Sequence, residues 1–389
     1  MQTTDYNEMI ETYSKIISIP AISPESGGVG ESKRVDFLQG LLKSWGLSPK
    51  RYDYTDQKKV KRSNLVVKYG DKKKTLWILA HTDTVAVGDI KMWKTDPFKA
   101  VVKEGKIYGR GSQDNGQGII TGLYTLKALL GKKDKMKYNY GLVLAADEEV
   151  GSKYGIVKLL KENIFEKGDM FIVPDSGSAD GKHIEIAEKS ILWLKITVIG
   201  KQVHGSTPQK GINAFMEGAR FGLDVTEFLS KKYNKIILPF GTKSSFVMTK
   251  HEKNVDSINI IPGKEVFYLD CRIMPNYSLT KVLEDINKMS KRYTAKIEIE
   301  IIQREDAPAP TRPNAEIVRL LKNRVKKDLG INAWLIGIGG GTIAAFLRRA
   351  GYDAVVWSIE EDIAHQPNEY AKLENVKKII EIFYNIVIT

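Results

Sequence analysis

The sequence has a single cysteine, Cys271, and only five histidines among 389 residues. One cysteine excludes an internal disulfide framework and a cysteine-rich zinc site, so a bound metal would need histidine and carboxylate ligands. Long apolar runs are also missing, since none approaches the roughly 20 residues of a membrane-spanning helix. The polar, acidic start of the chain lacks the basic and apolar parts of a secretion signal. We therefore expect a cytoplasmic location and no membrane partner.

Acidic residues are fewer than basic ones, and the formal net charge is +13. Such an excess raises the alternative of nucleic-acid binding, because clustered Lys and Arg neutralise phosphates. The basic clusters at residues 58–62, 72–74 and 132–135 fall in short connections between expected elements, and no RNA-binding motif accompanies them. We therefore expect no nucleic-acid partner, and binding that weakens steeply with salt would contradict this expectation.

The length and the order of the apolar patterns predict two domains. Strand-like runs alternate with helix-like patterns from residue 64 to residue 173, which is typical of an α/β domain with a doubly wound, mostly parallel sheet. From about Lys189 the pattern changes to two helices and four strands: helices 214–233 and 279–293, and strands 192–199, 257–261, 265–273 and 296–302. This order predicts an inserted α+β sandwich with one open face. We expect residues 1–188 and 304–389 to form the first domain and residues 189–303 the inserted one.

An apolar run from Leu76 to Ala80 ends in His81 and, two residues later, in Asp83. A continuous apolar run of this length predicts a strand that is buried on both faces. Such strands place ligand-binding residues at their carboxyl ends. Alternation along an extended chain puts His81 and Asp83 on the same side, so the carboxylate can hold the imidazole.

Further acids and one histidine also follow expected strands or stand in the loops after them. They are Asp114, the pair Glu148 and Glu149, Asp175, and His365. Two histidines and three carboxylates at one sheet edge can hold two ions such as Zn²⁺, with one carboxylate shared between them. The sequence therefore predicts a two-metal site.

These residues stand in motifs that resemble those of the M20 metallopeptidases and their relatives, which include carboxypeptidases, dipeptidases, aminoacylases, acetylornithine deacetylase and succinyl-diaminopimelate desuccinylase. The motifs occur in the family's order: His-x-Asp, Gly-Arg-Gly-x-x-Asp, Asp-Glu-Glu-x-Gly-Ser, Pro-Asp and His-x-x-Asn-Glu. The resemblance covers nearly the whole chain. It implies a zinc-peptidase-like catalytic domain with an inserted lid and dimerisation domain.

The resemblance also implies a role for each residue of the predicted site. His81 and Asp175 would bind one ion, and Glu149 and His365 the other. Asp114 would bridge the two ions, and Asp83 would orient His81. Glu148 would be the general base, because neighbouring acids in an extended segment point to opposite sides.

The inserted domain carries further matches. His204 resembles the family histidine that reaches into the partner subunit's site and stabilises the oxyanion, which implies a homodimer. Asn259 and Arg272 match positions associated with substrate binding, and an Arg can grip a carboxylate with two parallel hydrogen bonds. The glycines that end in Gly340 and Gly341, followed by Thr342, open an expected helix, so their backbone amides can receive an anion.

Each candidate also has an ordinary structural explanation. Residues 147–149 could form a solvated loop, His204 could be a turn histidine, and Arg272 could pair with Asp270. The glycines at 337–341 could be read as a nucleotide-binding loop, but no acid stands at the usual spacing. Neither Ser112 nor Ser176 stands in the Gly-x-Ser-x-Gly turn that serine hydrolases use.

Two positions depart from the family pattern. Gln117 stands where many relatives have Lys. Asp175 stands where desuccinylases and acetylornithine deacetylases generally have Glu, which favours the peptidase branch. We therefore expect a hydrolase with two divalent ions, Zn²⁺ or alternatively Co²⁺ or Mn²⁺, that cleaves amide bonds in dipeptides, short peptides or N-acyl amino acids with a free carboxylate. A deacylase of an N-acyl diamino acid is the alternative.

Overall fold

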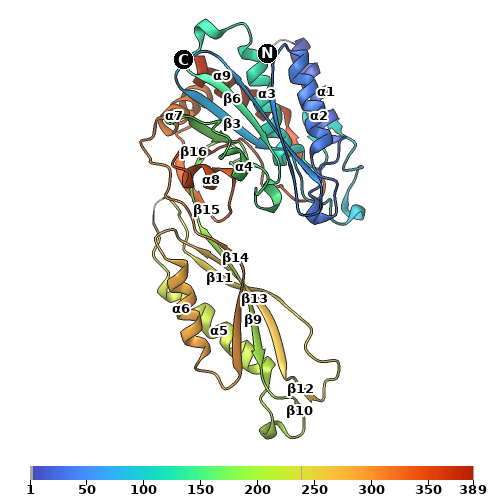
Figure 1. Ribbon diagram of the computed structural model, residues 1–389, viewed down its shortest axis with the longest axis vertical. Helices are drawn as coiled ribbons and strands as arrows, with labels where there is room; N and C mark the ends of the chain where they lie inside the picture. The colour runs from blue at the N-terminus through green and yellow to red at the C-terminus, as the bar shows by residue number, and fades with distance from the viewer. Residues whose placement is uncertain (1–2, 238, 389) are drawn as a thin grey trace. The chain divides into compact units, whose positions relative to one another are not determined.

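The computed structural model describes residues 3–237 and 239–388, and the chain divides into two compact units (Figure 1). The first unit is Met1–Ile186, Pro310–Leu335 and Thr342–Thr389, and the second is Ala187–Ala309 and Ile336–Gly341. The chain therefore leaves the first unit after residue 186, builds most of the second unit, and returns to the first unit at residue 310. Among the described residues, no helix is both long and apolar enough to cross a membrane.

An eight-stranded sheet organises the first unit, in the order β1-β2-β6-β3-β7-β16-β8-β15. The strands are β1 Lys50–Thr55, β2 Lys61–Tyr69, β3 Thr75–His81, β6 Asn139–Ala145, β7 Met170–Val173, β8 His183–Glu188, β15 Trp334–Ile338 and β16 Asp353–Val356. The central strands β6, β3, β7 and β16 pair in parallel, whereas β1, β2 and β8 join by antiparallel pairing. The expected α/β fold class, with its mainly parallel sheet, is confirmed.

Every residue of β3 is buried, because helices cover both faces of the sheet. Leu76 and Ile78 pack into a core on one face, and Trp77 and Leu79 into a core on the other. The first core is built with α1 Thr3–Ile17, α2 Ser32–Ser44, α3 Gly118–Leu129, α7 Glu316–Leu329 and α9 Leu373–Ile388. The second is built with α4 Ile156–Leu159 and α8 Ile343–Arg349. Two covered faces explain why the run before His81 is apolar throughout.

Shorter elements connect the layers of the first unit. A three-stranded sheet has the order β17-β5-β4, with bounds β4 Val101–Lys103, β5 Lys106–Tyr108 and β17 Tyr370–Lys372. The short helical turns are η1 Pro24–Ser26, η2 Ile90–Met92, η3 Ser112–Gln117, η4 Lys133–Lys135 and η5 Glu148–Val150. Two of these turns contain predicted ligands, Asp114 in η3 and Glu149 in η5. The strand β17 follows the predicted ligand His365 in the sequence.

The second unit is a four-stranded antiparallel sheet with two helices on one face. Its order is β11-β13-β9-β14, with bounds β9 Ser190–Ile199, β11 Ser245–His251, β13 Lys264–Ile273 and β14 Lys296–Glu305. The helices α5 Ala214–Lys232 and α6 Leu279–Ser290 share a core with alternate residues of β9, among them Leu192 and Leu194. Between these, Trp193 is 37% exposed, so the other face of the sheet is open.

The expected strand at 257–261 is wrong as a member of this sheet. Only Ile260–Ile261 is a strand, β12, and it pairs with β10 Val203–His204 in a separate two-stranded ribbon. The short helical turn η6 Pro208–Lys210 follows β10. β11 takes the sheet position instead. Most residues of β11 are exposed, so this edge strand shows little of the apolar alternation by which strands are found in a sequence.

The contacts divide the chain at slightly different positions from the expected domain boundaries after residues 188 and 303. β14 continues to Glu305, which pairs with Ile191, so the sheet of the second unit extends beyond residue 303. Residues 336–341 also belong to the second unit, where the Ile338 carbonyl accepts a hydrogen bond from the Lys189 backbone N–H at 3.0 Å. Backbone hydrogen bonds of this kind leave no pattern in the sequence.

Cys271 lies on β13 with no exposed surface, and burial, followed by the charge of Asp270, raises the pKa of its thiol to about 12. Because the thiolate is the reactive form, we expect no reaction of the native protein with a disulfide reagent near neutral pH, and one equivalent per chain in denaturant. Absorbance of the released thiol measures both. Full labelling of the native protein would contradict the buried position.

Candidate metal centre

The predicted ligands come from five segments that follow or flank the central strands. His81 is the last residue of β3, Glu149 lies in η5 just after β6, and Asp175 follows β7 by two residues. These three strands are parallel neighbours, so their carboxyl ends meet at one edge of the sheet. Asp114 comes from η3 and His365 from the loop before β17.

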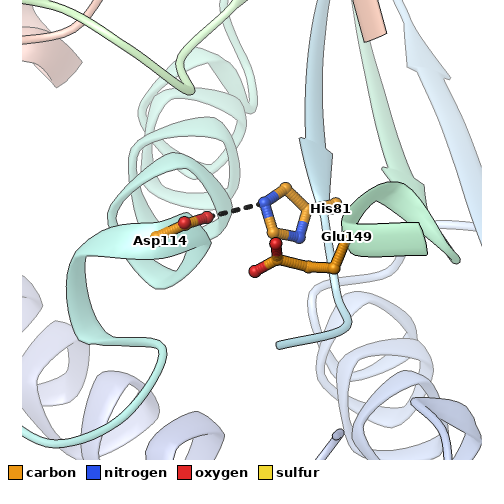
Figure 2. A group of neighbouring side chains, drawn as sticks. All are labelled: His81, Asp114 and Glu149. Carbon is orange, nitrogen blue, oxygen red and sulfur yellow. Dashed lines mark hydrogen bonds and ion pairs between the residues drawn. The ribbon is translucent and has the colours of Figure 1, made fainter. Parts of the chain in front are cut away.

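Asp114 lies between the two histidines, and each histidine also contacts a second carboxylate. Asp114 Oδ1 is 2.8 Å from His81 Nε2, and Asp114 Oδ2 is 3.0 Å from His365 Nε2. His81 Nε2 lies 3.2 Å from Asp175 Oδ1, and His365 Nε2 lies 3.1 Å from Glu149 Oε2. Figure 2 shows the side chains of His81, Asp114 and Glu149 converging from their separate elements. The structure thus brings all five predicted ligands together.

Ligand atoms about 2.1 Å from a tetrahedral ion lie about 3.4 Å from one another. The separations between the histidine nitrogens and the carboxylate oxygens are close to this value. Two overlapping groups, His81 with Asp114 and Glu149, and His81 with Glu148 and Asp175, each have their ligand atoms within 4.8 Å of one another. Glu149 Oε1 is buried and has no hydrogen-bond partner among the described residues, which leaves an oxygen for an ion. The donor set fits divalent cations.

Asp83 contacts His81 and also the segment that carries the two glutamates. Asp83 Oδ1 is 3.4 Å from His81 Nδ1, and the Asp83 carbonyl is 3.1 Å from the same nitrogen. The carboxylate also accepts hydrogen bonds from the Ser23 hydroxyl at 2.9 Å and from the backbone N–H groups of Glu148 and Glu149 at 3.1 and 3.2 Å. Asp83 can therefore fix the orientation of the imidazole and the position of η5 together.

Negative charge exceeds positive charge in this cluster, and the pKa values reflect it. Burial and the charge of Asp114 raise the pKa of Glu149 to about 7, although the bond to His365 lowers it. Hydrogen bonds to Asp114 and Glu149 raise the pKa of His365 to about 10. Burial lowers the pKa of His81, but the charge of Asp175 and the bonds to carboxylates raise it well above its usual value. This excess of carboxylates favours the binding of divalent ions, which would bring positive charge and displace protons from the ligands.

Glu148 stands beside this cluster on the side of His81 and Asp175. One of its oxygens lies within 4.8 Å of their ligand atoms. Burial, and next the charge of Asp175, raise the pKa of Glu148 well above its usual value. A carboxyl in such surroundings can gain and lose a proton near the reacting atoms.

Sequence reasoning missed several residues that hold the ligands in place. Asn115 donates hydrogen bonds from Nδ2 to Asp175 and, at 2.9 Å, to the Pro174 carbonyl. The Glu369 carboxylate accepts from the backbone N–H groups around Asp114. Glu369 stands in the quoted His-x-x-Asn-Glu motif, which was the available signal, whereas nothing in the pattern marked Asn115.

Gln117, which replaces the Lys of many relatives, is buried beside the centre. Its Nε2 donates to the Ser358 hydroxyl at 2.9 Å and to the Ile359 carbonyl at 3.1 Å. The departure therefore leaves a neutral, hydrogen-bonded side chain at this position.

The predicted residues of the inserted domain lie in the second unit. His204, on β10, is exposed, and its Nδ1 is 2.8 Å from the Ser206 hydroxyl. Asn259 is exposed and its carbonyl accepts from the Gly205 N–H at 2.7 Å. Arg272 donates to both oxygens of Asp270, at 2.7 and 3.1 Å, so the pairing given above as its ordinary explanation is present.

The glycine-rich turn is divided between the units. Arg272 Nη1 donates to the Gly339 carbonyl at 3.0 Å, and Gly340 and Gly341 follow in the second unit. Thr342 begins the last segment of the first unit and caps α8, with its hydroxyl accepting from the Ala344 N–H at 3.1 Å. The Thr342 hydroxyl therefore caps the first turn of α8.

The sequence profile of peptidase family M20/M25/M40 matches residues 77–389. The match spans most of the chain, which therefore belongs to this family and is a metal-dependent hydrolase of carbon–nitrogen bonds. Its sequence is 40% identical, over 407 aligned residues covering 98% of each protein, to a protein of Methanocaldococcus jannaschii described as an uncharacterized metallohydrolase. A succinyl-diaminopimelate desuccinylase of Nitratiruptor sp. is 26% identical, covering 98% of this chain and 99% of the relative.

Among solved structures, an M20 family metallo-carboxypeptidase from Sulfolobus solfataricus superposes with a TM-score of 0.74 at 22% identity. The superposition covers 97% of this chain and 98% of the other. The two proteins therefore share a fold over their whole lengths. The expected family is confirmed by the profile match.

Proposed function

We propose that this hydrolase uses two divalent ions to cleave the amide bond next to a free α-carboxylate in dipeptides, short peptides or N-acyl amino acids. The observation that carries the proposal is the position of Asp114 between His81 and His365, with its two oxygens 2.8 and 3.0 Å from their Nε2 atoms. A carboxylate in this position can be shared by two ions, each with its own histidine and a further acid.

The ligand sets would be His81 with Asp175 for one ion and His365 with Glu149 for the other, with Asp114 shared. When bound, the ions, for which we expect Zn²⁺ or alternatively Co²⁺ or Mn²⁺, would polarise the scissile carbonyl and lower the pKa of a water molecule. The buried, unpartnered Glu149 Oε1 supports such a set, because an orphaned buried carboxylate oxygen is costly without a cation.

The chain's own residues would carry the proton transfers. A Glu148 carboxylate oxygen accepts the proton of the attacking water and then donates it to the nitrogen of the leaving amine. The carbonyl and the carboxylate of Asp83 contact His81 Nδ1, so the imidazole directs its Nε2 atom toward the proposed ions. Both roles agree with the positions of the buried Asp83 and the half-buried Glu148 beside the cluster.

Recognition of the substrate carboxylate would come from Arg272 and Asn259, together with the amides of Gly340 and Gly341 and the turn at Thr342. Asp270 and the Gly339 carbonyl hold the Arg272 guanidinium, whose side chain is 26% exposed. A guanidinium held by an acid and a carbonyl loses little freedom when it binds a carboxylate. Residues 189–303 would act as the lid and dimerisation domain.

His204 would act in the partner subunit's site. A His204→Ala variant is expected to lower kcat by about 10²–10³, because a lost oxyanion donor has this effect. Mixing it with a Glu148→Gln variant should restore part of the activity, because a mixed dimer keeps one site with both residues. Steady-state kinetics of the separate and mixed variants measure this. Full activity of His204→Ala alone would contradict the role.

A substrate panel tests the proposal. Metal-reconstituted protein is assayed against dipeptides, N-acetyl amino acids and N-succinyl diamino acids. We expect hydrolysis of the dipeptides or N-acyl amino acids. We also propose that the enzyme is cytoplasmic and has no membrane or nucleic-acid partner. The second candidate is a deacylase of an N-acyl diamino acid, favoured by the 26% identity to the desuccinylase. Hydrolysis of the acylated diamino acids alone would decide for that candidate.

A further inference from the structure

Glu369 lies just before β17, is only 1% exposed, and accepts four hydrogen bonds at the edge of the metal centre. Its Oε1 accepts from the backbone N–H groups of Gln113 and Asp114 at 2.8 and 3.0 Å. Its Oε2 accepts from the Gly111 N–H at 3.1 Å and from Arg110 Nη1 at 2.7 Å. One side chain therefore holds three backbone amides of the segment that carries Asp114.

Arg110 extends this contact to the segment that carries His365. Its Nη2 donates to the His365 carbonyl at 3.2 Å and its Nη1 to the Gln366 carbonyl at 3.4 Å. The guanidinium is buried and lies 5.1 Å over the Trp93 ring. It is thus fixed by packing as well as by hydrogen bonds.

His365 needs such support, because its φ of 65° is in the left-handed region that residues other than glycine rarely adopt. A conformation of this kind is strained and persists only where the surroundings hold it. Arg110 binds the carbonyl of this residue, and Glu369 binds Arg110. The strained backbone is therefore linked to the Asp114 segment by two side chains.

We infer that Glu369, acting through Arg110, is a positioning residue that sets the separation of Asp114 and His365. These two side chains come from different segments, and their contact at 3.0 Å depends on the relative position of the two backbones. Glu369 touches neither a reacting atom nor an imidazole, so it acts only through the backbone it holds. The inference rests on the two-metal centre proposed above.

The test is a Glu369→Gln variant, which keeps the shape of the side chain but replaces one acceptor oxygen by an N–H₂ group. Each oxygen of Glu369 accepts two of the four hydrogen bonds, so two of them are lost whichever oxygen the N–H₂ group replaces. Co²⁺ binding is measured by calorimetry and by the visible absorption of the bound ion. We expect binding weakened by about 10–100-fold and an altered spectrum, as for other partners that orient ligands.

Hydrogen exchange of the metal-free protein gives a second measurement that needs no ion. The amides of Gly111, Gln113 and Asp114 are expected to exchange faster in Glu369→Gln than in the wild type. Glu185→Gln is the matched control, because Glu185 is also buried and accepts from Arg348 Nη1 at 2.9 Å. It should lower the melting temperature and leave Co²⁺ binding and this exchange unchanged.

Wild-type Co²⁺ affinity and wild-type exchange in Glu369→Gln would overturn the inference. If Glu369→Gln fails to fold, Arg110→Lys tests the inference instead. A lysine ammonium cannot reach Glu369 and the carbonyls of His365 and Gln366 at once. Unchanged Co²⁺ affinity of Arg110→Lys would also overturn the inference. If the wild-type protein binds no Co²⁺, the proposed function fails. Faster exchange in metal-free Glu369→Gln would still support the positioning role in that case, and unchanged exchange would refute it.

Discussion

Replacing Glu148 with glutamine is expected to lower kcat by about 10²–10⁴ while both ions stay bound. The amide keeps the size of the side chain but accepts no proton from water and returns none to the leaving amine. Glu148 lies beside His81 and Asp175, within 4.8 Å of their ligand atoms, where a proton can be moved close to the scissile bond. Steady-state kinetics and metal analysis of the purified variant measure the two quantities separately.

The neighbouring Glu149→Gln variant is the contrast. Glu149 Oε2 lies 3.1 Å from His365 Nε2, so its loss should weaken metal binding as well as turnover. Turnover retained by Glu148→Gln would remove Glu148 from the mechanism. Metal lost from Glu148→Gln would make this residue a ligand instead of the general base.

Replacing Asp114 with asparagine is expected to weaken the binding of both ions together. Asp114 has one oxygen 2.8 Å from His81 Nε2 and the other 3.0 Å from His365 Nε2, so its loss removes a carboxylate from both proposed ligand sets. We expect each affinity to fall by more than the roughly 10–100-fold that follows loss of an outer partner. Calorimetric titration with Zn²⁺ or Co²⁺ gives the number of sites and both affinities.

Asp169→Asn is the matched control for this change. Asp169 is a buried aspartate that accepts from the Thr75 N–H at 2.9 Å and from Trp77 Nε1 at 2.8 Å, and it is not one of the predicted ligands. The variant should melt at a lower temperature and bind the ions normally. One ion lost from Asp114→Asn with the other held at wild-type affinity would contradict a shared carboxylate.

The sequence predicted the fold where burial leaves a repeating pattern. β3 and β7 stood out because both faces of the sheet are covered and their residues are apolar throughout. β11 was missed because it is an exposed edge strand. The contacts of residues 336–341 with the second unit include hydrogen bonds to the Ile338 and Gly339 carbonyls, which leave no pattern in the sequence.

The clustering of the proposed ligands could be predicted because metal-binding side chains are specific residue types, and these stand at or near strand ends. His81 and Asp175 both follow apolar strands, and the structure places them 3.2 Å apart. The support around them could not be predicted in the same way. Asn115 and Glu369 act through hydrogen bonds to the backbone and to a ligand, and many residue types in a loop can make such bonds.

The proposed metal ligands are spread from His81 to His365, and the second unit is made entirely from the chain between these two residues. During synthesis on the ribosome, His365 and the strand β16 emerge only after that intervening unit is complete. A nascent chain therefore contains the first four proposed ligands long before the fifth. The strand β7 is likewise made before β16, the strand with which it pairs. In the proposed ligand sets, His81, Asp114 and Asp175 are therefore made early, whereas the set that contains His365 is complete only after nearly the whole polypeptide has been translated.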